Sequence, residues 1–535
     1  MSATIKKEKI TLFGRENISV YANRPTNLNE MLQKTVDQYP NKTAFIMEDE
    51  ELTYTEANDR ATRLAATLQQ EYGLAKGDRI ISLIGNDLAF PIVTFACFKL
   101  GAIMVPVNTK LTASEISYIV EHSKPKLIIH EDAYQAVINE SIQRFPEIEP
   151  YTQTTVSTGG AASGVTLESL INQNNELKAI PIEETDAAFI LYTSGTTGRP
   201  KGAVISHINV LHSVMHYKNT LQTDSEIRTI IAVPFFHVTG LVGQFLHMVY
   251  IGGSSAVLRR YQNEDYIRTS HKLKVNCHIN APTLFIMMAT SPIINDYSFD
   301  FVRIVGYGGS AIYQQTIEKM QEIFPNATYR NVYGATETTS PTTMMPASYP
   351  MSKVASVGFP VENGQVKVAD REGNELGTNE PGELLIKGPM VIGEYWDNEE
   401  ANKKSFIDGY WKSGDIAKID DDGFIYILDR MKDMINRGGE KIFSIEVEDV
   451  LKKHPEIIES AVISIPDETY GERVKAVIVS DSLKQGDEST IQTFCLKHLA
   501  KFKVPEVIEF IPELPKTASG KILKNQLRVE KKKKD

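Results

Sequence analysis

The chain has 535 residues, more than one hydrophobic core usually serves, so two or more folding units are expected. Apolar residues make up 42% and charged residues 23%, which is the balance of a soluble globular protein. With 57 basic and 68 acidic side chains, the formal net charge is −11. This charge disfavours nucleic acid as the main partner, because phosphate backbones are bound by basic surfaces.

The cysteines and the hydrophobic segments indicate the cellular compartment of the protein. Cys97, Cys277 and Cys495 lie far apart, which fits a reducing compartment and argues against a structural zinc site. No apolar segment of the signal-peptide type occurs near the N-terminus. The most hydrophobic stretch, 89–107, contains two prolines and a lysine, and it predicts a buried helix followed by a strand instead of a membrane span. We therefore expect a cytoplasmic protein without an integral membrane segment.

The basic C-terminal tail, 531–534, is a run of lysines. Such a run is usually a solvated end, and weak peripheral attraction to anionic lipid is the alternative. The sequence leaves both a monomer and a homodimer open.

Strands and helices alternate along the first part of the chain, as in parallel sheets with crossover helices. The elements predicted from hydrophobic periodicity are, in chain order, a helix at 28–38, strands near 43–45 and 52–54, a helix after Thr55, strands at 79–84, before 108 and at 126–129, a loop at 156–164, a strand at 187–191, a helix at 206–217, strands at 229–233 and 301–305, a helix ending at Phe324, and a strand at 328–333.

The pattern of predicted elements changes beyond residue 355. Short alternating strands at 365–368 and 382–387 predict a small β-rich lobe, and a compact α+β segment begins near residue 431. The expected fold class is therefore α/β. A large N-terminal region, 1–430, would hold two αβ layered subdomains and a small β-barrel-like lobe, followed by a mobile α+β C-terminal domain, 431–535.

A loop rich in glycine and hydroxyl side chains follows the buried strand at 187–191. It reads Thr193-Ser194-Gly195-Thr196-Thr197-Gly198-Arg199-Pro200-Lys201-Gly202. Glycines let backbone N–H groups converge on an anion, hydroxyls add hydrogen bonds, and Lys201 adds a point charge. The loop therefore predicts a polyphosphate site. It is not a Walker A loop, because Lys201 does not directly follow the second glycine.

Five further motifs follow the loop in a fixed order. They are Phe236-His237, Tyr333-Gly334-Ala335-Thr336-Glu337, Trp411-Lys412-Ser413-Gly414-Asp415, the pair Asp429-Arg430-Met431-Lys432-Asp433 and Arg437-Gly438-Gly439-Glu440, and Pro515-Lys516-Thr517-Ala518-Ser519-Gly520-Lys521. Each motif alone is weak evidence. Their order and spacing resemble those of the adenylate-forming (AMP-binding) superfamily, in its acyl-CoA synthetase branch.

The resemblance implies a site for ATP and Mg²⁺. It assigns the metal to Thr193 and Glu337, whose hard oxygen atoms suit Mg²⁺. It assigns the β- and γ-phosphates to Ser194, Gly195, Thr196, Thr197, Gly198 and Lys201, and the α-phosphate to Thr336. The adenine would lie against Gly308, Gly309, Ser310, Asn331, Val332, Tyr333 and Gly334. Asp415 and Arg430 would hold the ribose hydroxyls.

The resemblance also implies which residues act on the acid and on coenzyme A. Lys521 would bridge the substrate carboxylate and the phosphate in the first half-reaction, although in isolation it is indistinguishable from a surface lysine. Lys432 would be the hinge of the C-terminal domain, and His237 is placed among the catalytic residues. Asn436, Gly438 and Gly439 would lie beside the pantetheine arm of coenzyme A, and this protein departs from relatives that carry lysine at position 438.

The acid is a small-molecule carboxylic acid whose identity the sequence narrows but does not fix. The expected pocket walls, 237–241, 281–288 and Gly306, are apolar or small, and no acidic residue near His237 could pair with an α-ammonium group. A medium- or long-chain fatty acid is therefore favoured. An aryl acid such as a cinnamate or succinylbenzoate stays open, as do a non-CoA adenylate-forming enzyme and an idle acyl-adenylate sensor.

Overall fold

The computed structural model describes residues 6–152, 155–159, 165–193, 199–309, 314–516 and 522–528. The chain divides into two compact units. The first comprises residues 1–365 and 386–411, and the second comprises residues 366–385 and 412–535.

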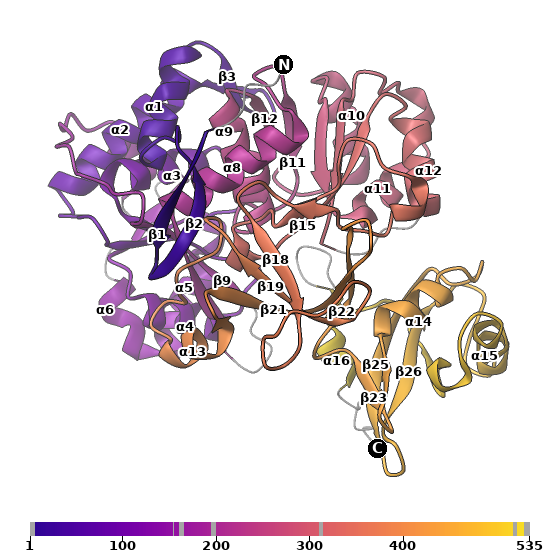
Figure 1. Cartoon of the computed structure of the whole chain (residues 1–535). Helices are drawn as coiled ribbons and strands as arrows, with labels where there is room; N and C mark the ends of the chain where they lie inside the picture. Colours follow the sequence, from indigo (N-terminus) through magenta and orange to yellow (C-terminus); the bar gives the residue numbers. More distant parts are fainter. Residues whose placement is uncertain are drawn as a thin grey trace. The chain divides into compact units, whose positions relative to one another are not determined.

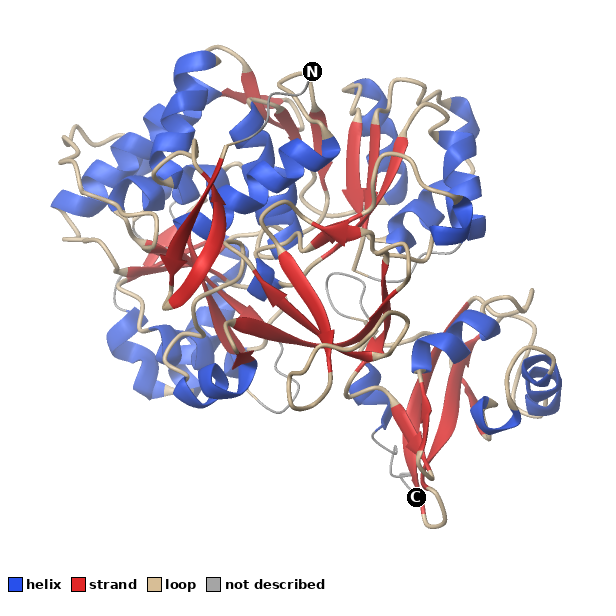
Figure 2. Ribbon diagram, viewed as in Figure 1, coloured by secondary structure: helices blue, strands red, loops and turns tan. Residues whose placement is uncertain are grey.

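The first unit contains two large sheets (Figure 2). Within the described ranges, one sheet has six strands in the order β10-β9-β6-β5-β7-β8. Its strands are β5 (Arg79–Leu83), β6 (Ile103–Pro106), β7 (Leu127–His130), β8 (Thr155–Ser157), β9 (Ala187–Thr193) and β10 (Lys201–Ser206). All neighbouring pairs are parallel except the hairpin of β9 and β10.

The second sheet has nine strands in the part of the chain that the structure describes, in the order β17-β16-β15-β14-β13-β11-β12-β3-β4. They are β3 (Thr43–Met47), β4 (Glu50–Thr53), β11 (Arg228–Ile231), β12 (Ser254–Val257), β13 (Cys277–Asn280), β14 (Ile304–Tyr307), β15 (Thr328–Tyr333), β16 (Thr343–Met344) and β17 (Phe359–Pro360). The central strands are parallel and the outer pairs are antiparallel.

One hydrophobic core joins the two sheets through a layer of helices (Figure 1). These helices are α1 (Leu28–Gln38), α2 (Tyr54–Gln70), α3 (Ala89–Leu100), α8 (His207–Leu221), α9 (His247–Ile251) and a π-helical segment (Thr239–Leu246). The outer helices are α4 (Ala113–Ser123), α5 (Gln135–Arg144), α6 (Glu149–Thr152), α7 (Leu167–Ile171), α10 (Asn263–Lys272), α11 (Pro282–Ala289), α12 (Gln314–Ile323) and α13 (Glu399–Ser405). A hairpin of β1 (Lys7–Leu12) and β2 (Arg15–Tyr21) precedes them, and β20 (Phe406–Ile407) pairs with the start of β21.

Local chemistry explains several boundaries. The helix α2 begins at Thr53, whose hydroxyl accepts from the Glu56 N–H while the Glu56 carboxylate accepts from Thr53. The helix α3 is buried on every side and ends at Gly101, which has a φ of 61°. The stretch 89–107 is thus a buried helix and strand, as predicted, and no described helix is long and apolar enough to cross a membrane.

The second unit contains two smaller sheets. Strands β18 (Gln365–Ala369), β19 (Gly382–Lys387) and β21 (Tyr410–Ile419) lie in that order, with β22 (Ile425–Arg430) paired to β21. The other sheet has the order β24-β23-β26-β25, with β27 beside β26. Its strands are β23 (Ile435–Arg437), β24 (Glu440–Ile442), β25 (Glu459–Asp467), β26 (Gly471–Val479) and β27 (Val507–Phe510), and its helices are α14 (Ser444–Leu451), α15 (Glu488–Leu496) and α16 (Lys524–Arg528).

Most predicted elements are confirmed, and two are corrected. The strand expected at 301–305 begins only at Ile304, because its register is fixed by pairing with Cys277 of β13. The segment 156–164 was expected to be a loop, yet Thr155–Ser157 forms the edge strand β8 beside β7. Both boundaries are set by a neighbouring strand and not by local sequence.

Candidate active site

The base of the glycine-rich loop is a β-hairpin. Thr193 ends β9, Lys201 begins β10, and the two residues are paired in the antiparallel register. The Thr193 hydroxyl lies 3.5 Å from the Lys201 carbonyl oxygen. The next residue, Gly202, has no room for a side chain, since a Cβ there would lie 2.7 Å from Ile190. The hairpin therefore sets Thr193 and Lys201 opposite each other; residues 194–198 lie outside the described residues.

The loop after β15 carries Thr336 and Glu337 in a tight turn. A Cβ on Gly334 would lie 1.4 Å from the Ser340 carbonyl oxygen, so only glycine fits there. The Ala335 N–H donates to the Thr338 hydroxyl at 2.9 Å. These contacts fold the backbone back on itself and place Glu337 within a short 3-10 turn.

Glu337 is held by both its backbone and its side chain. Its carbonyl oxygen accepts from the Ile392 N–H at 2.9 Å, and its Oε1 accepts from the Tyr395 hydroxyl at 3.0 Å. Burial raises the pKa of Tyr395 well above the ordinary value. Carboxylates that bind metals are commonly held by such hydrogen bonds, and Glu337 meets this condition.

The donors proposed at this site, the Glu337 carboxylate and the Thr193 hydroxyl, are the hard oxygen atoms that Mg²⁺ prefers. No group of three or more His, Cys, Asp or Glu side chains within the described ranges could form an all-protein metal cage. Mg²⁺ is usually held by one or two side chains together with substrate phosphates, so one carboxylate (Glu337) and one hydroxyl (Thr193) are a sufficient protein contribution.

The residues expected to hold adenine lie at the carboxyl ends of two adjacent parallel strands, β14 and β15. A Cβ on Gly308 would lie 2.1 Å from the Val332 carbonyl oxygen, and Gly309 has a φ of 82°. Asn331 is buried, and its amide donates to the Ser356 carbonyl oxygen at 2.9 Å. The structure thus brings 331–334 beside Gly308 and Gly309, while Ser310 lies outside the described residues.

The expected ribose pair is formed in the second unit. Asp415 and Arg430 are register partners on β21 and β22, and Arg430 Nε lies 2.7 Å from Asp415 Oδ1. The Asp415 side chain is buried, whereas Arg430 is more exposed. The neighbouring Asp429 accepts from both the N–H and the hydroxyl of Ser444, and burial raises its pKa to about 6.

The residues expected at the hinge and near coenzyme A follow β22. Lys432 lies in the turn before β23, and Asn436 is the middle residue of β23. Gly438 and Gly439 form the turn into β24 with φ values of 58° and 95°, and the Gly439 N–H donates to Asn436 Oδ1 at 3.1 Å. Both glycines have the positive φ values that a two-residue hairpin turn favours.

The C-terminal catalytic candidate, Lys521, lies outside the described residues. The residues on either side of it are described. Lys516 and Ile522 form an antiparallel bridge, so 517–521 connects two paired residues. Lys516 pairs with Glu459 at 2.6 Å, and Lys524 pairs with Glu448 at 2.8 Å.

His237 precedes the π-helical segment, and its Nδ1 accepts from the Thr239 N–H at 3.3 Å. The side chains of the expected pocket wall around it differ in burial. Leu241, Phe285 and Met288 belong to hydrophobic cores and have exposures of 1% or less, whereas Ile286 and Met287 are exposed. The 3.6-residue period of α11 explains this division, because one face packs inward and the other faces solvent.

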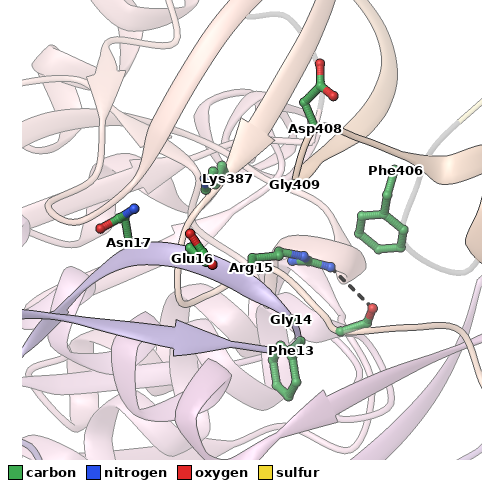
Figure 3. Close-up of a pocket in the computed structure, with 10 residues that line it drawn as sticks. Phe13, Gly14, Arg15, Glu16, Asn17, Lys387, Phe406, Asp408 and Gly409 are labelled. Atoms are coloured by element: carbon green, nitrogen blue, oxygen red, sulfur yellow. Dashed lines mark hydrogen bonds between the residues drawn. The ribbon is translucent and has the colours of Figure 1, made fainter.

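An open hollow of about 530 Å³ lies elsewhere in the first unit, between the β1–β2 turn and the β20 region (Figure 3). Its walls include Arg15, Lys387, Glu16, Asp408 and Phe406, and none of the expected site residues. Two cations are matched by two anions, and the Arg15 guanidinium already donates to backbone carbonyls.

Sequence reasoning missed Tyr395 altogether. It contacts two predicted site residues, since its hydroxyl donates to Glu337 and the Lys201 Nζ lies 5.1 Å from its ring centroid. The only local signal is an aromatic pair, Tyr395 and Trp396, in a polar segment.

A family model described as AMP-binding enzyme matches residues 32–396, and a model of the AMP-binding enzyme C-terminal domain matches residues 446–521. The first match covers more than half of the chain. The chain belongs to the AMP-binding enzyme family. This result confirms the resemblance that the order of the motifs indicated.

The relatives of this AMP-binding enzyme cover nearly its whole length. It is 34% identical to a 2-succinylbenzoate–CoA ligase of Bacillus licheniformis, over 93% of this chain and 98% of that one. It is 28% identical to a long-chain-fatty-acid–CoA ligase of Yersinia pestis, over 95% of each chain. The crystal structure of an anthranilate CoA ligase in complex with anthranoyl-AMP matches with a TM-score of 0.86 at 26% identity, over 94% of this chain and 97% of that one. The α/β fold class is confirmed, and the protein is an enzyme of the AMP-forming acid–thiol ligase class.

Proposed function

We propose that this enzyme is an ATP-dependent acyl-CoA synthetase. In the first half-reaction a carboxylate oxygen attacks the α-phosphorus of ATP, and acyl-AMP and pyrophosphate form. In the second, the thiol of coenzyme A attacks the acyl carbon, a proton leaves the sulfur, and acyl-CoA and AMP form. The observation that carries this proposal is the hairpin that sets Thr193 beside Lys201 at the base of the glycine-rich loop.

The nucleotide roles are divided among residues of the first unit. Thr193 and Glu337 would hold Mg²⁺, which neutralises charge on the phosphates when it is bound. The remaining contacts proposed for ATP are Ser194 to Gly198 and Lys201 with the β- and γ-phosphates, Thr336 with the α-phosphate, and Gly308, Gly309, Ser310 and 331–334 with the adenine. The close approach of Gly308 to Val332 supports this assignment, because it brings 308–309 and 331–334 together at the carboxyl ends of β14 and β15.

The second unit would supply the ribose contacts and the catalytic lysine. Asp415 would accept from the ribose hydroxyls, and Arg430, already ion-paired to it, would orient it. Lys521 would bridge the carboxylate and the α-phosphate. The chain would act as an N-terminal domain, 1–430, and a C-terminal domain, 431–535, that turns about Lys432 between the half-reactions and brings Asn436, Gly438 and Gly439 to coenzyme A.

The acid proposed is a medium- or long-chain fatty acid. The support is the apolar character of 237–241 and 281–288, together with the relative named as a long-chain-fatty-acid–CoA ligase. The exposed Ile286 and Met287 offer apolar surface that a long chain could cover.

An aryl acid is the second candidate, and the 34% identity with a 2-succinylbenzoate–CoA ligase favours it. Leu241, Phe285 and Met288 are also packed into hydrophobic cores, so they offer no exposed apolar surface to a long chain. A compact ring would require less rearrangement.

Acid-dependent exchange of labelled pyrophosphate into ATP, with a panel of fatty, aryl and amino acids, tests the proposal. We expect the fastest exchange with decanoate to palmitate, and thioester formation when coenzyme A is added. Faster exchange with 2-succinylbenzoate would select the second candidate. Exchange only with an amino acid would contradict both.

A further inference from the structure

One side chain of the first unit contacts both a phosphate candidate and a metal candidate of the proposed site. The Tyr395 hydroxyl donates to Glu337 Oε1 at 3.0 Å, and the Lys201 Nζ lies 5.1 Å from the centroid of the Tyr395 ring. Lys201 begins β10 of one sheet, whereas Glu337 lies in the turn that follows β15 of the other sheet. Tyr395 therefore contacts two residues of the proposed site that are far apart in sequence.

Tyr395 is held firmly in place. Its side chain is 3% exposed. Its backbone forms an antiparallel bridge with Ala203, two residues after Lys201. Asn402 accepts from the Tyr395 N–H at 2.7 Å and donates to its carbonyl oxygen at 3.2 Å. A side chain fixed at this many points can define where its contacts lie.

The direction of the hydrogen bonds follows from Trp411. The Trp411 Nε1 lies 3.3 Å from the Tyr395 hydroxyl, and an indole nitrogen can only donate. The hydroxyl oxygen therefore accepts from Trp411, and its own proton is directed to the Glu337 carboxylate. Such a chain of hydrogen bonds fixes the carboxylate orientation without removing its charge.

The ring has a separate effect on Lys201. An ammonium near an aromatic ring is attracted by the negative π face, which restricts a side chain that is otherwise flexible. We infer that Tyr395 is a positioning residue: its hydroxyl orients Glu337 toward a divalent cation, and its ring places the Lys201 ammonium for a phosphate. This inference rests on the proposed function and assigns a role to a residue outside the motifs that carried the family resemblance.

The two effects separate in two variants. Tyr395→Phe keeps the ring and removes the hydroxyl, so ATP binding without Mg²⁺ should stay within about twofold of wild type. The strengthening of ATP binding by Mg²⁺ should fall about 10–100-fold, the usual effect of losing a hydrogen-bond partner of a metal ligand. Tyr395→Leu removes the ring as well and should also weaken ATP binding without Mg²⁺. Calorimetric titration of ATP at several Mg²⁺ concentrations measures both quantities independently of turnover.

The chain offers a matched control in Tyr410. Its hydroxyl lies 3.5 Å from Gln365 Oε1, and the Lys387 Nζ lies 5.6 Å from its ring centroid, so it has the same kinds of contact away from the nucleotide residues. Tyr410→Phe should bind ATP as wild type does at every Mg²⁺ concentration. A further variant, Trp411→Phe, removes the donor that orients the hydroxyl and should show a smaller Mg²⁺ effect in the same direction.

Glu337→Gln separates this inference from the proposed function. If Glu337→Gln abolishes the strengthening of ATP binding by Mg²⁺ that wild type shows, the assignment of Glu337 to the metal stands. If Tyr395→Phe and Trp411→Phe then both keep the wild-type Mg²⁺ dependence, the inference is overturned while the proposed function survives. If wild type binds no ATP with or without Mg²⁺, the proposed function and the inference both fail.

Discussion

The Tyr217 hydroxyl lies 2.7 Å from the Ser340 hydroxyl, and both side chains are buried. Ser340 has a φ of 88° and the preceding Thr339 has a φ of 52°, and residues other than glycine rarely adopt such positive values. Thr339 is held by its own bond to the Met390 carbonyl oxygen at 2.8 Å. These two hydroxyl contacts stabilise the left-handed backbone that closes the loop containing Thr336 and Glu337.

Tyr217→Phe should therefore destabilise the fold and loosen this loop. A buried hydroxyl left without its partner typically costs about 1–3 kcal/mol in the free energy of unfolding. In a double-mutant cycle with Ser340→Ala, urea unfolding should give a coupling of about 1 kcal/mol. Additive single-variant effects would show that the two hydroxyls do not act together.

Glu337→Gln preserves the shape of the side chain and removes its charge. Adenylation should fall strongly and require more Mg²⁺, because the metal loses its only charged protein ligand among those proposed. Pyrophosphate exchange across a Mg²⁺ titration measures this. Glu399→Gln, an exposed residue paired with Lys403, is the control. An unchanged Mg²⁺ titration in Glu337→Gln would remove Glu337 from the metal site.

Lys521→Ala should act on the first half-reaction alone. Removing one preorganised donor to a developing charge usually lowers the rate by about 10²–10³. Exchange of pyrophosphate should fall by this factor, whereas thioester formation from synthetic acyl-AMP and coenzyme A should be retained. Equal loss of both half-reactions would indicate damage to the domain.

The control for Lys521 is decided by the structure. Lys516 and Lys524 are nearby, but each forms an ion pair, with Glu459 and Glu448, so their removal has structural effects of its own. Lys497 is exposed at the end of α15, and Lys497→Ala should leave both half-reactions unchanged. A wild-type rate of pyrophosphate exchange in Lys521→Ala would show that Lys521 has no role in the first half-reaction.

Lys432→Pro tests the proposed hinge, because proline fixes φ and removes the N–H. Acyl-AMP formation should survive better than thioester formation, as measured by single-turnover assays of each half-reaction. Lys432→Ala keeps the backbone free and should support both. A folded proline variant that completes both half-reactions equally well would contradict domain rotation about this residue.

Asp429 should make stability depend on pH. Its folded pKa is about 6 against an ordinary value of 3.8, so the folded state keeps a proton that the unfolded state has lost. Stability should therefore fall as the pH rises from about 4 to about 6 and should change little beyond that through this group. Asp429→Asn removes this titration, so the difference in Tm between wild type and variant should decline over that range. Parallel Tm curves would contradict the buried, proton-binding carboxyl.

Much of the fold followed from local pattern. The helix at 28–38 and the strand at 328–333 have the predicted bounds, because hydrophobic period and the Asn27 cap act within a few residues. The strand at Ile304 and the edge strand β8 were misjudged, since their limits depend on hydrogen bonds to other strands. The residues within each strand do not indicate which other strand it will pair with.

The sequence by itself determined the family and the enzyme class and predicted the residues for phosphate chemistry, because motif order along the chain and residue type are properties of the chain alone. Only the tertiary structure decided which side chains support them. The backbone of Tyr395 bridges to Ala203, nearly two hundred residues earlier, and its side chain contacts Lys201 and Glu337. The tertiary structure also showed that Leu241, Phe285 and Met288 are core residues. In the sequence, an apolar side chain of a pocket wall cannot be told from one of a packed interior, because only its neighbours in space distinguish the two.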